Sequence, residues 1–379
     1  MNIPRTIKLL SLIRGMVKSD YQRASGLMAE MHGLPQKMGQ HFTLYLSPGF
    51  DRYFQTLCVS SKAEDIPIEA VLAELKLDYN SSALYAQASI GQVYRVETQE
   101  GPLAVKVRYP GVEKRVKSDF GILRGILWPI RFLPLRNSGL VPLVGQVKSM
   151  LLDECDYHRE ARDQESFFRL FLDDPEICVP EVISHNDRAI ASRWMAGHSP
   201  VNPHGQGLWF VRTYLRFILK SLNRLGMVHS DPHPGNFIIN DEKQRLAVLD
   251  FGSVARFTPE ETRAVTRMLT GDYTCESDLV DDLATLGVSC EALEMYRPII
   301  GDLVSILMEP LYHPGLYNFA EWRMQYKLNT LLASRSWEKP LPMPPKLLLL
   351  VRTLQGIFFY ARRNMVMLNW PETITTCLE

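Results

Sequence analysis

The sequence predicts an α+β fold of two lobes, a small one with an antiparallel sheet and a long helix and a mostly helical one, preceded by a helical N-terminal extension. Three observations predict this arrangement. Residues 91–98 alternate apolar and polar side chains, and residues 103–109 return after the turn-forming sequence 99–102. Residues 144–172 fit one long helix. Helical patterns dominate from residues 208–225 onward.

The length of 379 residues is too great for one minimal domain and suits two. We expect the extension over residues 1–82, the small lobe over 83–198 and the large lobe over 199–379. Short strands are expected in the large lobe at 237–240 and 246–249, around a polar turn.

Local signals add detail near the junction of the lobes. The pattern predicts a strand at 190–194 and a connector at 195–200. Gly226 follows the helix expected over 208–225 and is placed as its C-terminal cap, because glycine adopts the left-handed conformation without steric cost. From Thr258 onward the pattern is helical.

Composition narrows the functional classes. Lysine and arginine number 42, as do aspartate and glutamate, so no global positive field favours nucleic-acid binding. Hydrophobic residues make up 46%, which is enough to bury a core. The six cysteines form no CxxC pair, which predicts reduced thiols of a cytoplasmic protein rather than disulfides or a zinc site.

No uninterrupted apolar run reaches the length of a transmembrane helix. Residues 3–23 carry five basic residues and an apolar helical face. They fit an ordinary surface helix, which is the favoured interpretation, or a membrane-surface helix or transit segment. The sequence therefore predicts a cytoplasmic protein and leaves peripheral membrane attachment and organellar targeting open.

The strongest chemical signal is His229-Ser-Asp-Pro-His-Pro-Gly-Asn236, followed by Asp250-Phe-Gly252. Phosphoryl transfer needs hard oxygen ligands for Mg²⁺ and a group that orients the attacking oxygen and takes its proton. Asn236 and Asp250 are the candidate metal ligands, and Asp231 is the candidate catalytic residue. The interval from Asp231 to Asn236 is that of a kinase catalytic loop, and the second motif follows one hairpin later.

Two other interpretations of this segment compete with a kinase-like site. One is a turn-rich loop without chemistry, because Asp-Pro and Pro-Gly favour turns. The other is a zinc site made by His229, Asp231 and His233. The kinase-like spacing accounts for the same residues better, because it also explains the hairpin and the Asp-Phe-Gly sequence that follow.

The small lobe offers groups for a nucleotide's phosphates. Lys106 lies in the return strand, where a lysine can pair with the α- and β-phosphates and with a helix carboxylate. The loop before the first strand has one glycine where an ordinary kinase has three, which predicts a stiffer phosphate loop. A surface lysine and a plain strand-entry loop are the alternatives. The candidate nucleotide-binding residues of the loop are Ala86, Ala88, Ser89, Ile90, Gly91 and Gln92.

Acidic residues gather on the long helix expected over residues 144–172. At about 100° per residue, Asp156 and Glu160 are about 40° apart and share a face, whereas Glu154 lies about 240° from Glu160. The face with Asp156 and Glu160 would then pair with Lys106, and Glu154 would contact a different neighbour. A solvated acidic face is the commoner alternative.

The combination of motifs resembles the UbiB/ABC1 (AarF-type) family of atypical kinase-like proteins, which is linked to ubiquinone and other prenyl-lipid metabolism. The lysine-glycine-glutamine motif alone is weak evidence, but the whole set in family order is specific. It consists of Lys37-Met-Gly-Gln40, the alanine-rich loop 86–94, Glu154-x-Asp156 leading to Glu160-Ala161, and the segment 229–236 before Asp250-Phe-Gly252.

The resemblance implies a bilobal protein-kinase-like fold and a role for each motif residue. Lys106 and Glu160 would form the ion pair that organises the small lobe. Asp231 would be the catalytic aspartate, and Asn236 and Asp250 would hold the metal. The implied cofactors are ATP or ADP and Mg²⁺.

A regulatory arrangement is also implied by the resemblance. Lys37 and Gln40 would reach from the extension into the site, near Glu154 and Asp156. The extension would then occlude the place where a protein substrate would lie. ATP hydrolysis, or phosphorylation of a small lipid-related substrate, is therefore expected rather than ordinary protein kinase activity.

Four residues depart from the family pattern. Arg193 stands where a hinge glutamate is usual, and Ser192 where a larger residue is common. Asp163 replaces a frequent asparagine, and Ser230 a frequent alanine. The hinge changes leave adenine recognition open, whereas the phosphate and metal residues are unaffected.

The sequence is compatible with four functions to different degrees. An Mg-ATP-dependent atypical kinase or ATPase is favoured, with nucleotide, a prenyl lipid or quinone precursor and a membrane surface as partners, and no nucleic acid. A regulatory ATP-binding pseudokinase or chaperone-like protein with little turnover is the alternative. A true protein kinase is disfavoured because residues 253–260 pass directly into a helix. A phosphotransferase for small alcohols or antibiotics would not explain the first two family motifs.

Overall fold

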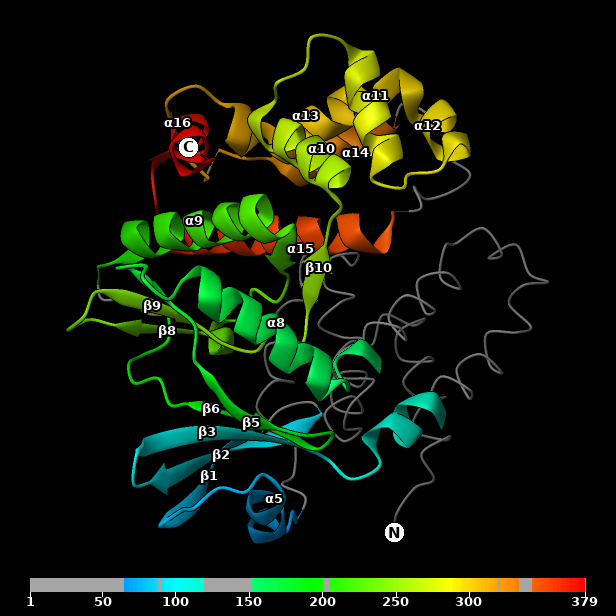
Figure 1. The fold of residues 1–379 in the computed structure, drawn as a ribbon. Helices are drawn as coiled ribbons and strands as arrows, with labels where there is room; N and C mark the ends of the chain where they lie inside the picture. Colours follow the sequence, from blue (N-terminus) through cyan, green and yellow to red (C-terminus); the bar gives the residue numbers. More distant parts are fainter. Residues whose placement is uncertain are drawn as a thin grey trace, which may run out of the picture. The chain divides into compact units, whose positions relative to one another are not determined.

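The computed structural model describes residues 65–87, 90–118, 152–200, 205–319, 321–333 and 343–378. The chain divides into two compact units, whose elements are labelled in Figure 1. Unit 1 runs to Arg162 and includes Glu181–Trp194, and unit 2 holds Asp163–Pro180 and Met195–Glu379. Most of the expected N-terminal extension, with Lys37 and Gln40, lies outside the described residues.

Unit 1 is built on a five-stranded antiparallel sheet in the order β1-β2-β3-β6-β5. The predicted hairpin is confirmed, although its second strand begins two residues earlier than expected, at Gly101. The strands are β1 (Ser81–Gln87), β2 (Gly91–Thr98), β3 (Gly101–Arg108), β5 (Val182–His185) and β6 (Ala189–Arg193).

Alternation along β3 decides which residues enter the core of unit 1. Leu103, Val105 and Val107 are buried on one face, in a cluster that includes Val71 of helix α5 (Ile68–Glu74). Helix α5 lies beside β1, β2 and β3 (Figure 1). Because side chains alternate across a strand, Lys106 projects from the opposite face of the sheet.

The long helix expected over residues 144–172 is shorter in the structure. Helix α8 spans Tyr157–Leu170, and a turn at Glu154–Cys155 separates it from the short helical stretch at residues 152–153. The prediction of one continuous helix was therefore wrong at this turn. Residues 144–151 lie outside the described part of the chain.

Asp156 explains where helix α8 begins. Its carboxylate accepts a hydrogen bond from the backbone N–H of Arg159 at 2.9 Å, which is the bond that an N-cap aspartate makes. The side chain is therefore directed at the helix end. The predicted common face for Asp156 and Glu160 does not hold, because it assumed that the helix passed through both residues.

Unit 2 is mostly helical. Its described strands form three small sheets, β10–β7, β11–β12 and β4–β9–β8. Helices α9 (Gly207–Leu225) and α15 (Pro345–Arg363) run side by side (Figure 1) and supply much of the core. The other elements are β4 (Ile177–Cys178), β7 (Met227–His229), a 3₁₀ turn (Pro234–Asn236), β8 (Phe237–Asn240), β9 (Arg245–Val248), β10 (Val254–Arg256), α10 (Pro259–Thr270), α11 (Glu276–Thr285), α12 (Cys290–Tyr296), a second 3₁₀ turn (Arg297–Ile299), α13 (Ile300–Tyr312), β11 (Leu316–Tyr317), α14 (Met324–Ala333), β12 (Leu368–Asn369) and α16 (Trp370–Leu378).

The predicted cap at Gly226 is confirmed. This residue follows α9 with φ 62°, and its N–H donates to the carbonyl of Leu222. A Cβ at this position would lie 2.6 Å from the carbonyl oxygen of Phe257. Glycine is therefore required both by the backbone conformation and by the close approach of the chain that follows β10.

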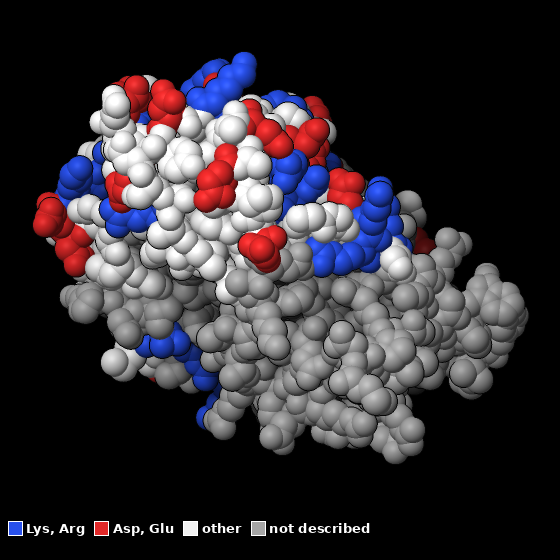
Figure 2. Space-filling model, turned by 90° about the horizontal axis from the view of Figure 1, so that it is seen from below, with Lys and Arg blue, Asp and Glu red and all other residues white. Residues whose placement is uncertain are grey.

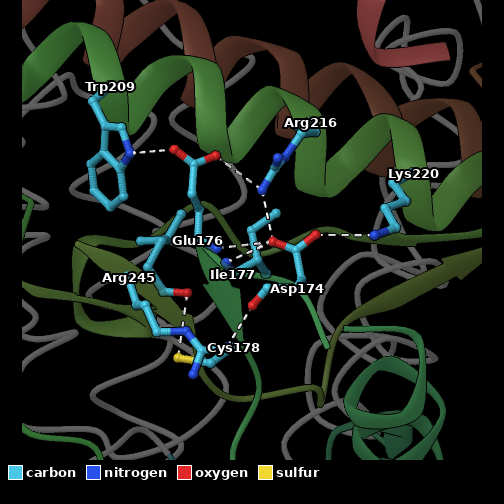
Figure 3. Close-up of polar contacts among 9 residues, drawn as sticks. Asp174, Glu176, Ile177, Cys178, Trp209, Arg216, Lys220 and Arg245 are labelled. Atoms are coloured by element: carbon cyan, nitrogen blue, oxygen red, sulfur yellow. Dashed lines mark hydrogen bonds and ion pairs between the residues drawn. The ribbon is translucent and has the colours of Figure 1, made fainter. Parts of the chain in front are cut away.

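Asp174 attaches β4 to helix α9 (Figure 3). Its buried carboxylate accepts hydrogen bonds from Arg216 at 2.7 Å and Lys220 at 3.0 Å, and from the backbone N–H of Ile177 at 3.0 Å. Burial alone would raise its pKa, but these donors and cations hold the pKa below the usual range. The carboxylate is therefore ionised at neutral pH and fastens the chain just after α8.

Among the described residues there is neither a disulfide nor a membrane-spanning helix, and charges of both signs mix on one face of the surface (Figure 2). On the face shown in Figure 2, acidic and basic side chains of the described residues are interspersed. The five cysteines in the described ranges are free thiols. None of the described helices combines the length and apolar content needed to cross a membrane.

Thr258→Ala should destabilise unit 2. Thr258 caps α10 with a capping box, in which its hydroxyl accepts from Glu261 N at 3.2 Å and its own N–H donates to the Glu261 carboxylate at 2.7 Å. We expect the free energy of unfolding in urea to fall by ~1 kcal/mol. Thr270→Ala, in the exposed last turn of α10, should change it by less than ~0.5 kcal/mol. Equal losses in the two variants would contradict the capping role.

Candidate functional site

In unit 1, Lys106 and Glu160 form an ion pair. Lys106 Nζ of β3 lies 2.8 Å from Glu160 Oε1 in the first turn of α8, and the side chains are 16% and 3% exposed. The Lys106 ammonium also lies 5.4 Å from the ring centroid of Tyr157. The structure thus brings together two residues that the motifs singled out, and their role toward a nucleotide remains a prediction.

The turn before α8 is attached to the same strand. Arg108 of β3 donates a hydrogen bond to the carbonyl oxygen of Cys155. Burial raises the pKa of the Cys155 thiol to about 11, so this thiol is protonated at neutral pH. Glu154 is buried beside it, whereas Asp156 caps the helix. The two acids of the Glu-x-Asp motif therefore have separate positions, and their predicted regulatory role toward Lys37 and Gln40 stays a prediction.

The alanine-rich loop is described in part. Ala86 lies in β1, and Ala88 and Ser89 lie outside the described residues. Ile90 and Gln92 are buried, so their side chains are not presented to a solvent-borne ligand. Any contact that these two residues make with phosphate would come from the backbone.

The single glycine of this loop has a packing reason. A Cβ on Gly91 would lie 2.3 Å from the carbonyl oxygen of Val107, on the neighbouring strand. Gly91 therefore allows β2 to approach β3 closely. This requirement is separate from the phosphate contact that the sequence predicts.

In unit 2, His229 fastens the catalytic-loop candidate to the Asp-Phe-Gly segment. Its Nε2–H donates to the carbonyl oxygens of Leu249 at 3.1 Å and Asp250 at 3.0 Å. Burial lowers the pKa of the imidazole, so His229 is neutral at pH 7. No group of three or more His, Cys, Asp or Glu in the described residues is suited to hold a metal, so the zinc interpretation gains no support.

Asn236 and Asp250 are the predicted metal ligands, and both carry side-chain oxygen atoms. The side-chain amide of Asn236 donates to the carbonyl oxygen of Asp231 at 3.2 Å, which orients its own carbonyl oxygen away from that bond. Asp250 adopts the left-handed conformation with φ 55°, which non-glycine residues seldom do outside functional sites and turns. One carboxylate and one amide fit Mg²⁺, which usually takes one or two protein ligands and completes its shell with phosphates and water.

Arg352 is a functional candidate that the sequence analysis missed. Its Nη2 lies 2.5 Å from Asp231 Oδ1, and the two residues are 8% and 9% exposed. In the sequence it was only a charge that interrupts an apolar run. A single charge within an apolar helix is nevertheless a usable signal, because buried charges need partners.

Helix α15 contacts the catalytic-loop candidate at three further points. The Thr353 hydroxyl donates to the carbonyl of His229 at 3.3 Å, and the Tyr360 hydroxyl to that of Pro232 at 2.9 Å. Gly356 lies so close to Pro232 that a Cβ would be 2.1 Å from the proline Cβ. These residues share one helix face with Arg352, so a single rigid element positions the loop.

The departures from the family pattern have partners. Asp163 of α8 is buried and forms an ion pair with Arg256 of β10, so the carboxylate replaces an amide where a cation is present. The Ser230 hydroxyl donates to the carbonyl of Val228 and accepts from Ala255 N, which joins β7 to β10. At the hinge, the Arg193 side chain bonds to Glu100.

Comparisons with curated proteins place the chain among kinase-like relatives. "Protein ACTIVITY OF BC1 COMPLEX KINASE 3, chloroplastic" of Arabidopsis thaliana is 26% identical, over an aligned region that covers 80% of this chain and 43% of that protein. "Uncharacterized protein sll0005" of Synechocystis is 30% identical, with 77% and 43% covered. "Atypical kinase COQ8B, mitochondrial" of Rattus norvegicus is 27% identical, with 92% and 70% covered. The chain thus spans less than half the length of the first two.

A solved structure and a family model agree on the fold class. The complex of Rv3197 with erythromycin from Mycobacterium tuberculosis matches with a TM-score of 0.59 at 22% identity, over 95% of this chain and 96% of that one. Together with the sheet-rich first lobe and the helical remainder, this likeness shows the predicted kinase-like fold. The model of the ABC1 atypical kinase-like domain matches residues 74–282, more than half of the 379 residues. The chain therefore belongs to the ABC1 atypical kinase-like family.

Proposed function

We propose that the protein is an Mg-ATP-binding atypical kinase or ATPase that supports ubiquinone or other isoprenoid-lipid metabolism. One observation carries the proposal: the charged and polar residues that phosphoryl transfer needs are all present, and the contacts described above hold them. They are the Lys106–Glu160 pair, Asp231 beside Arg352, and Asn236 and Asp250 on the segments that His229 joins.

Unit 1 would supply the phosphate-binding cation. A β3 lysine paired with a helix glutamate is held in place to meet the α- and β-phosphates. Val93 pairs directly with Lys106 across the β2–β3 ladder, and Ala104 lies two residues before it, so all three project from one face of the sheet. Small apolar side chains beside the ammonium support binding of a flat nucleobase.

Unit 2 would supply the metal ligands and the catalytic carboxylate. Asn236 and Asp250 would hold Mg²⁺, which when bound neutralises charge on the phosphates. Asp231 would orient the attacking oxygen of water or of an acceptor hydroxyl and take its proton. The amide of Asn236 supports this role, because its bond to the Asp231 carbonyl fixes the loop that carries the carboxylate.

Other functions receive less support. The intact residue set favours turnover over a regulatory pseudokinase. Helix α10 begins at Pro259, soon after Gly252, which leaves little chain for the activation segment of a protein kinase. The resemblance to UbiB/ABC1 proteins supports the link to quinone or prenyl-lipid metabolism. Relatives named as mitochondrial or chloroplastic make an organelle the alternative to the cytoplasm, with peripheral attachment to a membrane proposed in either case.

The test is phosphate release from ATP with Mg²⁺, with and without liposomes or a quinone-like phenol. Asp231→Asn should lower the rate by ~10²- to 10⁴-fold, because it removes the proton acceptor. Asp281→Asn, on the exposed side of α11, should leave the rate unchanged. Absence of release from the wild type under every condition, together with ATP-dependent thermal stabilisation, would favour the regulatory ATP-binding function instead.

A further inference from the structure

We propose that Arg352 is a further catalytic residue, which holds Asp231 before the nucleotide binds and then contacts the transferred phosphoryl group. Helix α15 would supply this arginine from within the same chain. The inference rests on the proposed function of the site. It adds a cation, and a direct role in stabilising the transition state, to the residues named above.

The catalytic-loop candidate lacks a cation of its own. Residues 229–236 contain no lysine or arginine. Phosphoryl transfer places charge on the oxygens of the moving group, and an arginine supplied from elsewhere, in the same chain or a partner, can raise the rate by ~10³- to 10⁵-fold. Within unit 2, Arg352 lies 2.5 Å from the carboxylate assigned to the attacking oxygen, so its charge is on the side of attack.

The geometry of the guanidinium suits two anions in succession. Its planar fork of N–H donors can bind a carboxylate and a phosphate oxygen in the same plane. In a productive complex the attacking oxygen lies within about 3–3.5 Å of the phosphorus. A guanidinium already bound to Asp231 therefore needs only a short side-chain movement to reach the phosphoryl oxygens.

Packing alone gives little reason for a buried arginine at this position. A buried ion pair is often no more stabilising than well-packed apolar side chains of similar volume. Leu348, four residues earlier and therefore on the same face of α15, is buried. An apolar residue would therefore continue the pattern of α15, and a charge at this position is better explained by chemistry at Asp231.

Three contacts of α15 make this charge well placed for catalysis. Thr353, Gly356 and Tyr360 hold the helix against His229 and Pro232, on either side of Asp231 in the chain. The Cα of Arg352 is therefore fixed relative to the carboxylate of Asp231. A preorganised donor needs little rearrangement when charge develops, which is the condition for strong transition-state stabilisation.

A purely positioning role for Arg352 makes a different prediction. If Arg352 acts only by orienting Asp231, its removal should have no further effect once Asp231 is asparagine. If it contacts the phosphoryl group, Arg352→Gln should lower the residual rate of the Asp231→Asn enzyme again. The cycle of the two single variants and the double variant separates the roles.

The experiment measures Mg-ATP phosphate release and the binding of Mg-ADP with and without aluminium fluoride, which mimics the phosphoryl group in transfer. For Arg352→Gln we expect kcat to fall by ~10²- to 10³-fold, with KM and the Kd for ADP within about threefold of wild type. The extra affinity that aluminium fluoride gives should be lost. Arg352→Lys, which keeps the charge, should recover part of both, and Arg362→Gln, in the exposed last turn of α15, should match wild type.

Each outcome supports or overturns a catalytic role for Arg352. Wild-type kcat in a folded Arg352→Gln protein would overturn the inference and leave the proposed function intact. Additional loss in the double variant supports the phosphoryl contact, and no additional loss overturns it. If Arg352→Gln does not fold, the same measurements on Arg352→Lys decide. A wild type that neither hydrolyses ATP nor binds ADP more tightly with aluminium fluoride would overturn the inference and the proposed turnover together.

Discussion

Gly356→Ala should displace the catalytic-loop candidate and destabilise the protein. The added Cβ would lie 2.1 Å from Pro232 Cβ and 2.5 Å from its Cγ. Neither the helix backbone nor the proline ring can yield without moving Asp231, the preceding residue. We expect the free energy of unfolding to fall by ~1–3 kcal/mol, as for an overpacked core. A displacement of about 1 Å at the carboxylate would lower phosphate release by ~10²-fold.

Gly301→Ala is the matched control for this substitution. Gly301 is also helical, in the first turn of α13, but nothing lies within 4 Å of the position that its Cβ would take. Alanine should therefore stabilise the protein by ~0.5–1 kcal/mol, through helix propensity alone. Urea denaturation of both variants measures the two effects. If both substitutions stabilise the protein equally, the close contact between α15 and the loop is wrong.

Asp250→Asn should abolish magnesium-dependent nucleotide binding while leaving the fold intact. Asparagine has nearly the same shape as aspartate and tolerates the left-handed conformation found at this residue. It lacks the negative charge by which a carboxylate binds a hard cation more strongly than an amide does. Loss of metal stabilisation worth several kcal/mol predicts a decrease in kcat on the order of 10³-fold. The measurement is the Kd for ATP with excess Mg²⁺ and with a chelator.

In the wild type, the Kd for ATP should depend strongly on Mg²⁺. In Asp250→Asn, ATP should bind weakly both with excess Mg²⁺ and with a chelator. Asp272→Asn, which removes an exposed carboxylate in the loop after α10, should behave as the wild type. The assignment of Asp250 as a metal ligand fails if its variant keeps the wild-type dependence on Mg²⁺.

Features set by neighbouring residues were predictable. The β2–β3 hairpin follows from period-two alternation, and the end of α9 follows from glycine at position 226. The start of α8 was not predicted, because apolar periodicity continues through Asp156, whose side chain instead caps a new helix. Local competition between a side chain and the helical backbone decided that boundary.

The candidate site was predictable in part for the same reason. Asp231, Asn236 and Asp250 lie in motifs whose spacing indicates their chemistry before any contact is known. Gly91 was expected to serve phosphate, but its neighbour Val107 shows an additional packing requirement. Composition and spacing cannot reveal which backbone atoms approach a residue.

The sequence by itself predicted the kinase-like fold that the structure shows, and it is the source of the proposed chemistry and of the charged residues assigned to it. Only the tertiary structure decided that Arg352 pairs with Asp231. It also decided that Gly356 packs against Pro232 and that the Tyr360 hydroxyl donates to the carbonyl of Pro232, more than 100 positions earlier in the chain. The apolar pattern of α15 shows that one face is buried but not what covers it. A buried charge needs a partner, but this requirement does not say where in the sequence the partner lies. The partner is set by how distant segments of the chain pack together.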